Sequence, residues 1–516
     1  MQPREHTHSR GANSLGLQSR CANRTGVRLR CGPHAKALRG GRARFLARHA
    51  AERTVNDGDR VNAEPEVGIV GEDPRDELER ELSLSDAVFL VVACVIGAGI
   101  FFTPGRVAEL IPHPYWILAA WLFGGLLSLA GALANAELGA MFPRAGGNYV
   151  YLREGVHPIA GFLVGWLTFF AIFAGTIAAL AAIAAEQMVA WWGLSESWVV
   201  PVAVAITLVS SALNIPSVRS GARANNVASI FKIGALVAFC LIGPMIGGGD
   251  LGRLSPSSLP DAIATPTLVG FGLAMSPVLF SYLGWNSSVY VASEIKNPVR
   301  NLPISLFGAL GICTGLYLAL NCLYLYALPI TELIGINDAG GATAEVFFGS
   351  SGAMIVGGIV LASVLGTLNA TVLLGPRVAY SMALDGLFFG GAEKVNPAFR
   401  TPVAAIWVQA GVTIAILMLL RNFPSALDFT TFAILLASMA DIVALYRLRV
   451  REPNRPRPYR AWGYPFVPGL YFAATLAISG AMIWGRPLEC LVGALMIAAG
   501  LPFYFLFKNR GEREKP

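Results

Sequence analysis

Apolar runs of about 20 residues recur from residue 84 almost to the C-terminus, and each is long enough to cross roughly 30 Å of hydrocarbon as a helix. Charged residues make up only 14% of the chain, whereas soluble domains average about 25%. We therefore predict an all-α polytopic membrane protein. This class excludes a soluble enzyme, a nucleic-acid-binding module and a secreted disulfide scaffold, although the net charge of +7 would suit an acidic partner.

The hydropathy pattern predicts twelve transmembrane helices within a transporter domain at residues 82–508. The predicted spans run over about 86–111, 115–141, 158–190, 197–214, 226–246, 265–293, 303–328, 352–384, 402–420, 424–446, 465–485 and 487–507. If the N-terminus is cytosolic, nearly all of the 39 Lys and Arg residues fall on the cytosolic side, as the positive-inside rule requires. The exceptions in outer loops are Arg106, Arg253, Arg421 and Arg486. We expect both termini in the cytosol, with a short C-terminal tail at residues 509–516.

Residues 1–81 differ from the rest because they are basic, polar and without a long apolar run. We expect a disordered cytosolic tail. Two alternatives remain open, namely an upstream extension from a misplaced start codon and an organelle transit peptide. The seven cysteines contain no C-x-x-C pair, so we expect neither a metal site nor any other cofactor.

Two predicted spans are interrupted near their middles, and these two spans occupy corresponding positions in two successive sets of five. The break in span 1 comprises Ile96, Gly97, Ala98, Gly99 and Ile100. The break in span 6 comprises Phe280, Ser281, Tyr282, Leu283, Gly284 and Trp285. Such paired breaks indicate a transporter binding site. Free N–H groups at one break suit a carboxylate, and free carbonyls at the other suit an ammonium, which together favour a zwitterionic amino acid.

Five motifs occur in order along residues 82–507: GAGIFFTPG, FPRAGGNYVYLRE, FSYLGWNSSVYVASEIKNPVRNLP, RVAYSMALDGLFF and RPRPYRAWGYPFVPGLYF. Together they resemble the amino acid–polyamine–organocation superfamily, and within it the L-type amino acid transporter-like permeases. The resemblance implies the fold of the bacterial leucine transporter, with inverted repeats at about 86–246 and 265–446. Two C-terminal helices at about 465–507 would follow. It also implies an amino acid as the small-molecule partner and places Ile96 to Ile100, Phe280, Ser281 and Leu283 at the substrate.

Lys232 lies about seven residues inside span 5, where a charge is costly. One reading is that its side chain snorkels to the cytosolic interface. The resemblance implies instead that the ammonium occupies the place of a sodium ion, with Ser363 as its partner on span 8. Phe280, Tyr282 and Trp285 are candidate gating aromatics.

Two further acidic residues lie within or near the spans. We expect Glu137 and Asp441 to be structural ion pairs or interfacial groups rather than proton relays.

This chain departs from the L-type pattern at Leu283, where many members carry a glycine. The added bulk favours small or medium neutral substrates. The outer loop at 191–197 holds no cysteine, so we expect no disulfide-linked heavy chain. The sequence thus predicts a sodium-independent amino acid exchanger or proton-linked permease of the plasma membrane, in a bacterium the inner membrane.

Three alternative functions compete with this prediction. A polyamine or amine carrier would need acidic residues at the breaks, and neither break has one. A multipass membrane enzyme would need a metal cluster or a Ser/His pair within the spans, and the sequence has no such pattern there. A transport-dead sensor stays open, because uptake alone separates it from a carrier.

Overall fold

The computed structural model describes residues 78–216, 218–255, 267–420 and 423–513. All of these residues belong to one compact unit. The predicted tail up to residue 77 and Arg421 lie outside the described residues. Within the described part of the chain the elements are helical, and no strand longer than an isolated bridge occurs. The predicted all-α class is confirmed.

The first half of the described chain contains seven long or medium helices and several short turns. They are α2 (Leu84–Val95), α3 (Gly99–Phe102), α4 (Pro104–Leu110), α5 (Pro114–Met141), α6 (Asn148–Gly155), α7 (Pro158–Leu167), the π-helical turn η1 (Thr168–Phe173), α8 (Ala174–Trp191), η2 (Glu196–Trp198), α9 (Val199–Leu213) and α10 (Val218–Ile246).

The second half follows a similar order. Its elements are η3 (Leu251–Leu254), α11 (Leu268–Ser281), α12 (Ser287–Tyr290), η5 (Ala292–Glu294), α13 (Pro298–Ala327), α14 (Ile330–Leu333), α15 (Ala339–Leu384), α16 (Val403–Leu420), α17 (Phe423–Arg451), α18 (Phe466–Gly485) and α19 (Pro487–Arg513). In α15 a kink at Gly349, where φ is +69°, separates a short first helix from the predicted span.

Ten helices in the described residues are long and apolar enough to cross a membrane. Two shorter apolar helices, α11 and α16, coincide with predicted spans 6 and 9. The helix α11 is short because the predicted break ends it at Ser281. Twelve crossings therefore remain a prediction. Several helices also continue beyond the predicted spans, including α19, because polar flanking residues can extend a helix after the hydrocarbon ends.

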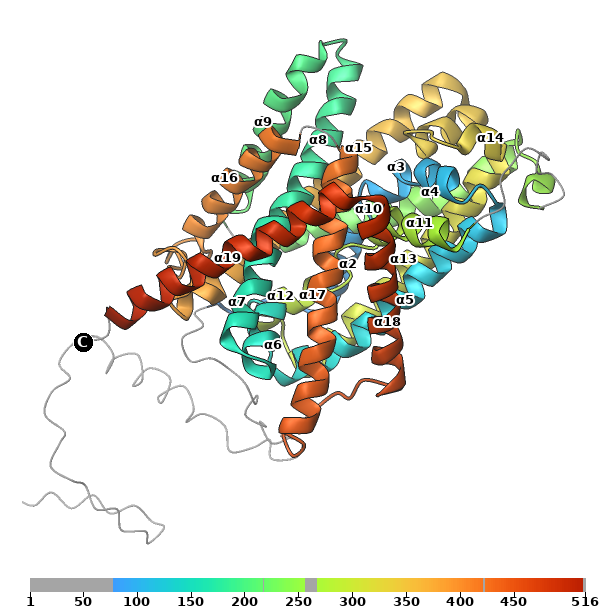
Figure 1. Cartoon of the computed structure of the whole chain (residues 1–516). Helices are drawn as coiled ribbons and strands as arrows, with labels where there is room; N and C mark the ends of the chain where they lie inside the picture. Colours follow the sequence, from blue (N-terminus) through green and yellow to red (C-terminus); the bar gives the residue numbers. More distant parts are fainter. Residues whose placement is uncertain (1–77, 217, 256–266, 421–422, 514–516) are drawn as a thin grey trace, which may run out of the picture. The chain divides into compact units, whose positions relative to one another are not determined.

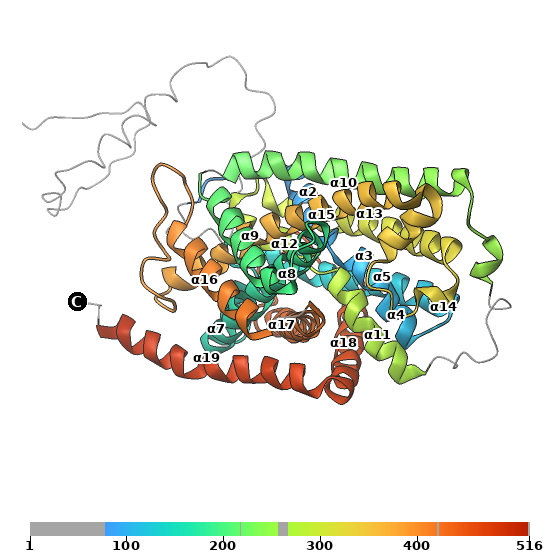
Figure 2. The same ribbon diagram turned by 90° about the horizontal axis from the view of Figure 1, so that it is seen from above.

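The helices pack around an almost wholly buried third span, which runs from α7 through η1 to α8. The helix α13 lies along α5 and α2, and α17 contacts α8, α11, α18 and α19. In Figure 2, α10 and α19 lie on opposite sides of this arrangement, with α2, α15, α8 and α17 between them. Both outer helices expose large apolar side chains such as Val227 and Leu495, as helices that face lipid do.

Residues 80–82, where the predicted tail meets the predicted transporter domain, make specific contacts with residues 294–296. The N–H of Leu82 donates to Glu294 O at 2.8 Å, and Lys296 N donates to Leu82 O at 2.8 Å. Ser83 then caps α2 through its side chain and the Asp86 carboxylate. Figure 1 labels the helix α2 that follows these residues.

Candidate functional site

The predicted break in span 1 is present in the structure. The helix α2 ends at Val95 and α3 begins at Gly99, so Ile96, Gly97 and Ala98 interrupt the helix in the middle of a buried segment. The break in span 6 is also present, between Ser281 and Ser287. At Gly284 the backbone has φ of +92°, a conformation that favours glycine.

The two breaks lie against each other. The hydroxyl of Thr103 is 3.0 Å from that of Ser281, and a side chain at Gly99 would collide with Ser281. The hydroxyl of Tyr317 on α13 lies 2.7 Å from Val95 O and 2.8 Å from Ser281 O. One buried phenol therefore joins the carbonyl ends of α2 and α11, whereas the sequence predicts free carbonyls at one of the two breaks only.

Lys232 extends from α10 into the break of span 1. Its ammonium donates to Ile96 O at 3.0 Å and to the side-chain oxygen of Thr367 on α15 at 2.9 Å, with Ala93 O at 3.5 Å. The side chain is 2% exposed. The snorkelling alternative is wrong for this conformation, because the ammonium points to the break and not to the membrane surface.

Ser363 joins the same cluster indirectly, since its hydroxyl donates to Ile96 O at 3.2 Å. The residue that contacts the ammonium is Thr367, whose hydroxyl also lies 2.6 Å from Ala93 O and 2.8 Å from Ile96 O. Sequence reasoning missed Thr367. The signal was available, because Thr367 follows Ser363 by one helical turn and so shares its face.

A small inner cavity of about 30 Å³ lies beside the breaks, with room for about one or two water molecules. Leu283 lines it, as do polar side chains from five elements. These are Asn148, Thr176, Asn286, Ser287, Tyr290, Thr371 and Ser438. Ile172 and Phe173, at the end of the π-helical turn η1, complete one wall. None of the polar residues was predicted from the sequence.

A larger cavity of about 720 Å³ opens on the other side of the breaks, along α4 and the end of α8. Thr103 lies in its wall, and Arg106 forms an ion pair of 2.5 Å with Asp428 on α17. Ser276 donates to the same carboxylate at 2.7 Å. Asp338 also lines this cavity, and burial raises the pKa of its carboxyl above its ordinary range. The cavity connects the break with the side that the charge rule predicts to be outside.

The predicted gating aromatics take different positions. Phe280 is buried at the end of α11. The hydroxyl of Tyr282 donates to Trp121 O at 2.9 Å, and its ring packs against Trp121 and Tyr317. The Trp285 ring lies against Gly131 of α5. The rings of Tyr282 and Trp285 therefore both contact α5.

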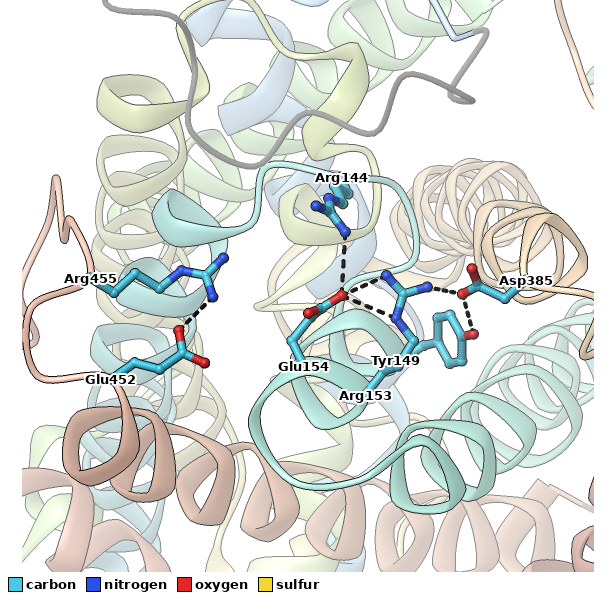
Figure 3. A network of polar contacts seen from close by, with 7 residues as sticks. All are labelled: Arg144, Tyr149, Arg153, Glu154, Asp385, Glu452 and Arg455. Carbon is cyan, nitrogen blue, oxygen red and sulfur yellow. Dashed lines mark hydrogen bonds and ion pairs between the residues drawn. The ribbon is translucent and has the colours of Figure 1, made fainter.

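The polar segment after span 2 folds as the short helix α6 and is held by charges, as Figure 3 shows. Arg153 pairs with Glu154 at 2.7 Å and with Asp385 at the end of α15. Tyr149 donates to the same Asp385 carboxylate at 2.5 Å. These contacts connect the segment to α15 at the end of the molecule that the charge rule places in the cytosol.

The two acidic residues singled out in the sequence behave differently. The Glu137 carboxylate pairs with Arg449 at 2.6 Å and Arg457 at 3.3 Å, so the predicted structural ion pair is confirmed. Asp441 is fully buried and forms no ion pair with any described residue, so the same expectation is wrong for Asp441. Among the described residues no group of His, Cys, Asp and Glu side chains is suited to hold a metal ion.

Comparison with known proteins places this geometry in a family. A family model described as "Amino acid permease" matches residues 82–505. The serine/threonine exchanger SteT of Bacillus subtilis is 31% identical over 84% of this chain and 98% of that protein. Large neutral amino acids transporter small subunit 2 of Homo sapiens is 26% identical over 89% of this chain and 86% of its own length. Asc-type amino acid transporter 1 of Mus musculus is 28% identical over 83% and 81%. The chain belongs to the amino acid permease family, whose members are membrane transporters and not enzymes.

Proposed function

We propose that the chain is a sodium-independent exchanger of small neutral amino acids in the plasma membrane, in a bacterium the inner membrane, with both termini in the cytosol. That it transports amino acids follows from its family. The observation that carries the finer proposal is the Lys232 ammonium bound in the break of span 1.

The contacts of the ammonium support sodium independence. Lys232 uses Ile96 O, Ala93 O and the Thr367 hydroxyl, which are oxygen ligands of the kind that replace the hydration shell of a metal cation. A fixed positive charge at these oxygens both satisfies them and repels a second cation. The ion that would tie span 1 to span 8 is therefore supplied by the protein.

The limited room beside the breaks supports a small substrate. The inner cavity is narrow in this conformation, and Leu283 occupies part of its wall. The relative that is named a serine/threonine exchanger supports small substrates and an exchange mode. The carbonyl end of α11 and the first N–H groups of α3 offer an acceptor end and a donor end for the two charges of an amino acid, and the Tyr317 hydroxyl must release Ser281 O for that carbonyl to take part.

The test is exchange in liposomes that contain the purified single chain. Vesicles loaded with unlabelled L-serine should take up labelled L-serine much faster than empty vesicles, at equal rates in sodium and choline media. A steep requirement for sodium would overturn the sodium-independent part of the proposal. Uptake of labelled spermidine without uptake of any neutral amino acid would favour the amine carrier instead. Activity of the single chain would also support the absence of a disulfide-linked partner.

A further inference from the structure

Asp441 lies in the middle of α17 with its carboxyl group completely buried. One oxygen, Oδ2, accepts a hydrogen bond of 3.2 Å from the side-chain amide of Asn135 on α5. The other oxygen, Oδ1, has no partner among the described residues. The side-chain oxygen of Asn135 and the hydroxyl of Tyr151 on α6 are likewise buried without a partner.

In the part of the chain that the structure describes, no positive charge pairs with this carboxyl. The described titratable groups that interact electrostatically with the Asp441 carboxyl are the phenols of Tyr151, Tyr290 on α12 and Tyr471 on α18. The other acid nearby along α5 is Glu137, whose charge is already balanced by two arginines. An ionised carboxylate buried without a cation is strongly unfavourable, and an intramembrane acid of this kind is by default a functional group.

We propose that Asp441 is a proton-binding site whose protonation permits the inner side of the transporter to close. A proton taken from water forms an O–H bond at Oδ1, removes the charge and converts an acceptor without a partner among the described residues into a donor. The inference rests on the proposed function for its effect on transport, but the binding of the proton is independent of it.

The position of Asp441 connects this proton to the substrate pathway. Ser438, one turn before it on α17, lines the inner cavity, and so does Tyr290. Tyr151 belongs to α6, the segment held by Asp385, and Asn135 belongs to α5. Opening the inner side must separate some of these elements and admit water, in which the carboxylate is stable. Closing it again returns the group to a dry environment, where the neutral acid is favoured.

Infrared difference spectroscopy of the purified full-length protein tests the binding of the proton directly. Between about pH 8 and about pH 5, the wild type should gain the carbonyl band of a protonated carboxylic acid. In Asp441→Asn the band should lose the contribution of Asp441, while other buried carboxyls such as Asp338 keep theirs, and it should be unchanged in the control Glu452→Gln, which removes a carboxylate from a partly exposed ion pair. A wild type without a titrating band, or a band of equal size in Asp441→Asn, would overturn the proposal.

Labelled L-serine exchange, with equal pH inside and outside, tests the consequence. The wild-type rate should fall as pH rises, by up to about tenfold per pH unit above the midpoint, because ionised Asp441 resists burial. Asp441→Asn is neutral at every pH and should give a flat profile, whereas Asp441→Glu should keep a slope with a displaced midpoint. A flat wild-type profile alone would overturn the role in transport, even if Asp441→Asn failed to fold. If no amino acid is exchanged at all, the proposed function fails, and the infrared result still decides the proton site.

Discussion

The ammonium of Lys232 donates a hydrogen bond of 2.9 Å to the side-chain oxygen of Thr367. Both groups also converge on the carbonyl oxygen of Ile96, in the break of span 1. Three elements far apart in sequence, α10, α15 and the end of α2, are therefore connected at one buried point. A movement of the break relative to α15 must break these hydrogen bonds.

Replacing Lys232 by methionine should abolish or severely weaken L-serine exchange while membrane insertion is preserved. Methionine is similar in length and removes the charge, so packing changes little, but Ile96 O and the Thr367 hydroxyl lose the ammonium as a hydrogen-bond donor. Exchange in liposomes and the yield of monodisperse protein measure the two effects. Lys296→Met, at an exposed lysine, is the matched control and should behave like the wild type. A fully active Lys232→Met protein would remove Lys232 from the mechanism.

Thr367→Val should lower exchange more than Ser363→Ala. Valine keeps the shape of threonine but leaves the ammonium and nearby carbonyls short of a partner, at a cost of about 1–3 kcal/mol. Such a cost corresponds to a loss of roughly tenfold to a hundredfold in rate if it falls on the transport step. Thr367→Ser retains the hydroxyl and should retain most of the activity. If Ser363→Ala proved the more damaging change, the contact ranking seen in the structure would not apply to the working cycle.

Glu137→Gln should destabilise the protein by about 3–5 kcal/mol, because two arginines would lose the buried carboxylate between them. The same carboxylate accepts the backbone N–H of Ala461 at 2.7 Å, so the loop before α18 should also loosen. The apparent Tm in detergent is the measurement. The control, Glu452→Gln, removes a partly exposed pair and should cost about 0–1 kcal/mol. Equal Tm values for the two variants would contradict the structural role of Glu137.

Two N-terminal truncations distinguish the role of residues 2–77 from that of residues 78–82, which contact the rest of the chain. Removing residues 2–77 should leave exchange largely intact, as the composition of this stretch suggests. Removing residues 2–82 also deletes the two backbone hydrogen bonds that Leu82 makes with residues 294 and 296. The segment that Leu82 contacts includes Glu294, whose side chain forms a buried ion pair of 2.9 Å with Arg377. The longer deletion should therefore reduce exchange or yield, and two equally active truncations would show that this pairing is dispensable.

The helical class and both breaks were predictable because their signals are local. Apolar runs identify spans, and the glycines at 97, 99 and 284 lie where the helices are interrupted. The contacts within the site were less accessible. Whether Ser363 or Thr367 contacts Lys232 depends on the position of α15 along its axis relative to α10, which hydropathy does not determine. The π-helical turn η1 shifts the register of the third span by an extra residue, and no residue type in this turn predicts that shift.

Asp441 shows why spacing along a helix is not sufficient to predict an ion pair. Arg447 lies about 9 Å further along the axis, within reach by length alone. Six residues, however, rotate the helix by roughly 240°, so the two side chains leave it in different directions. Arg447 is exposed and Asp441 is buried. Its true neighbours, Asn135 and three tyrosines, come from four other helices that the sequence does not place beside it.

Leu283→Gly should broaden the substrate range toward larger neutral amino acids. Leu283 lines the inner cavity, and removing its side chain adds space beside the break of span 6 without adding charge. Excess unlabelled L-leucine or L-phenylalanine should then inhibit labelled L-serine exchange more strongly than in the wild type. Leu279→Ala, on α11 just before the break and outside the lining of that cavity, controls for general loosening and should leave the preference unchanged. Unaltered competition in Leu283→Gly would mean that another residue limits the size of the substrate. Ser438, which also lines the cavity, would then be the next position to vary.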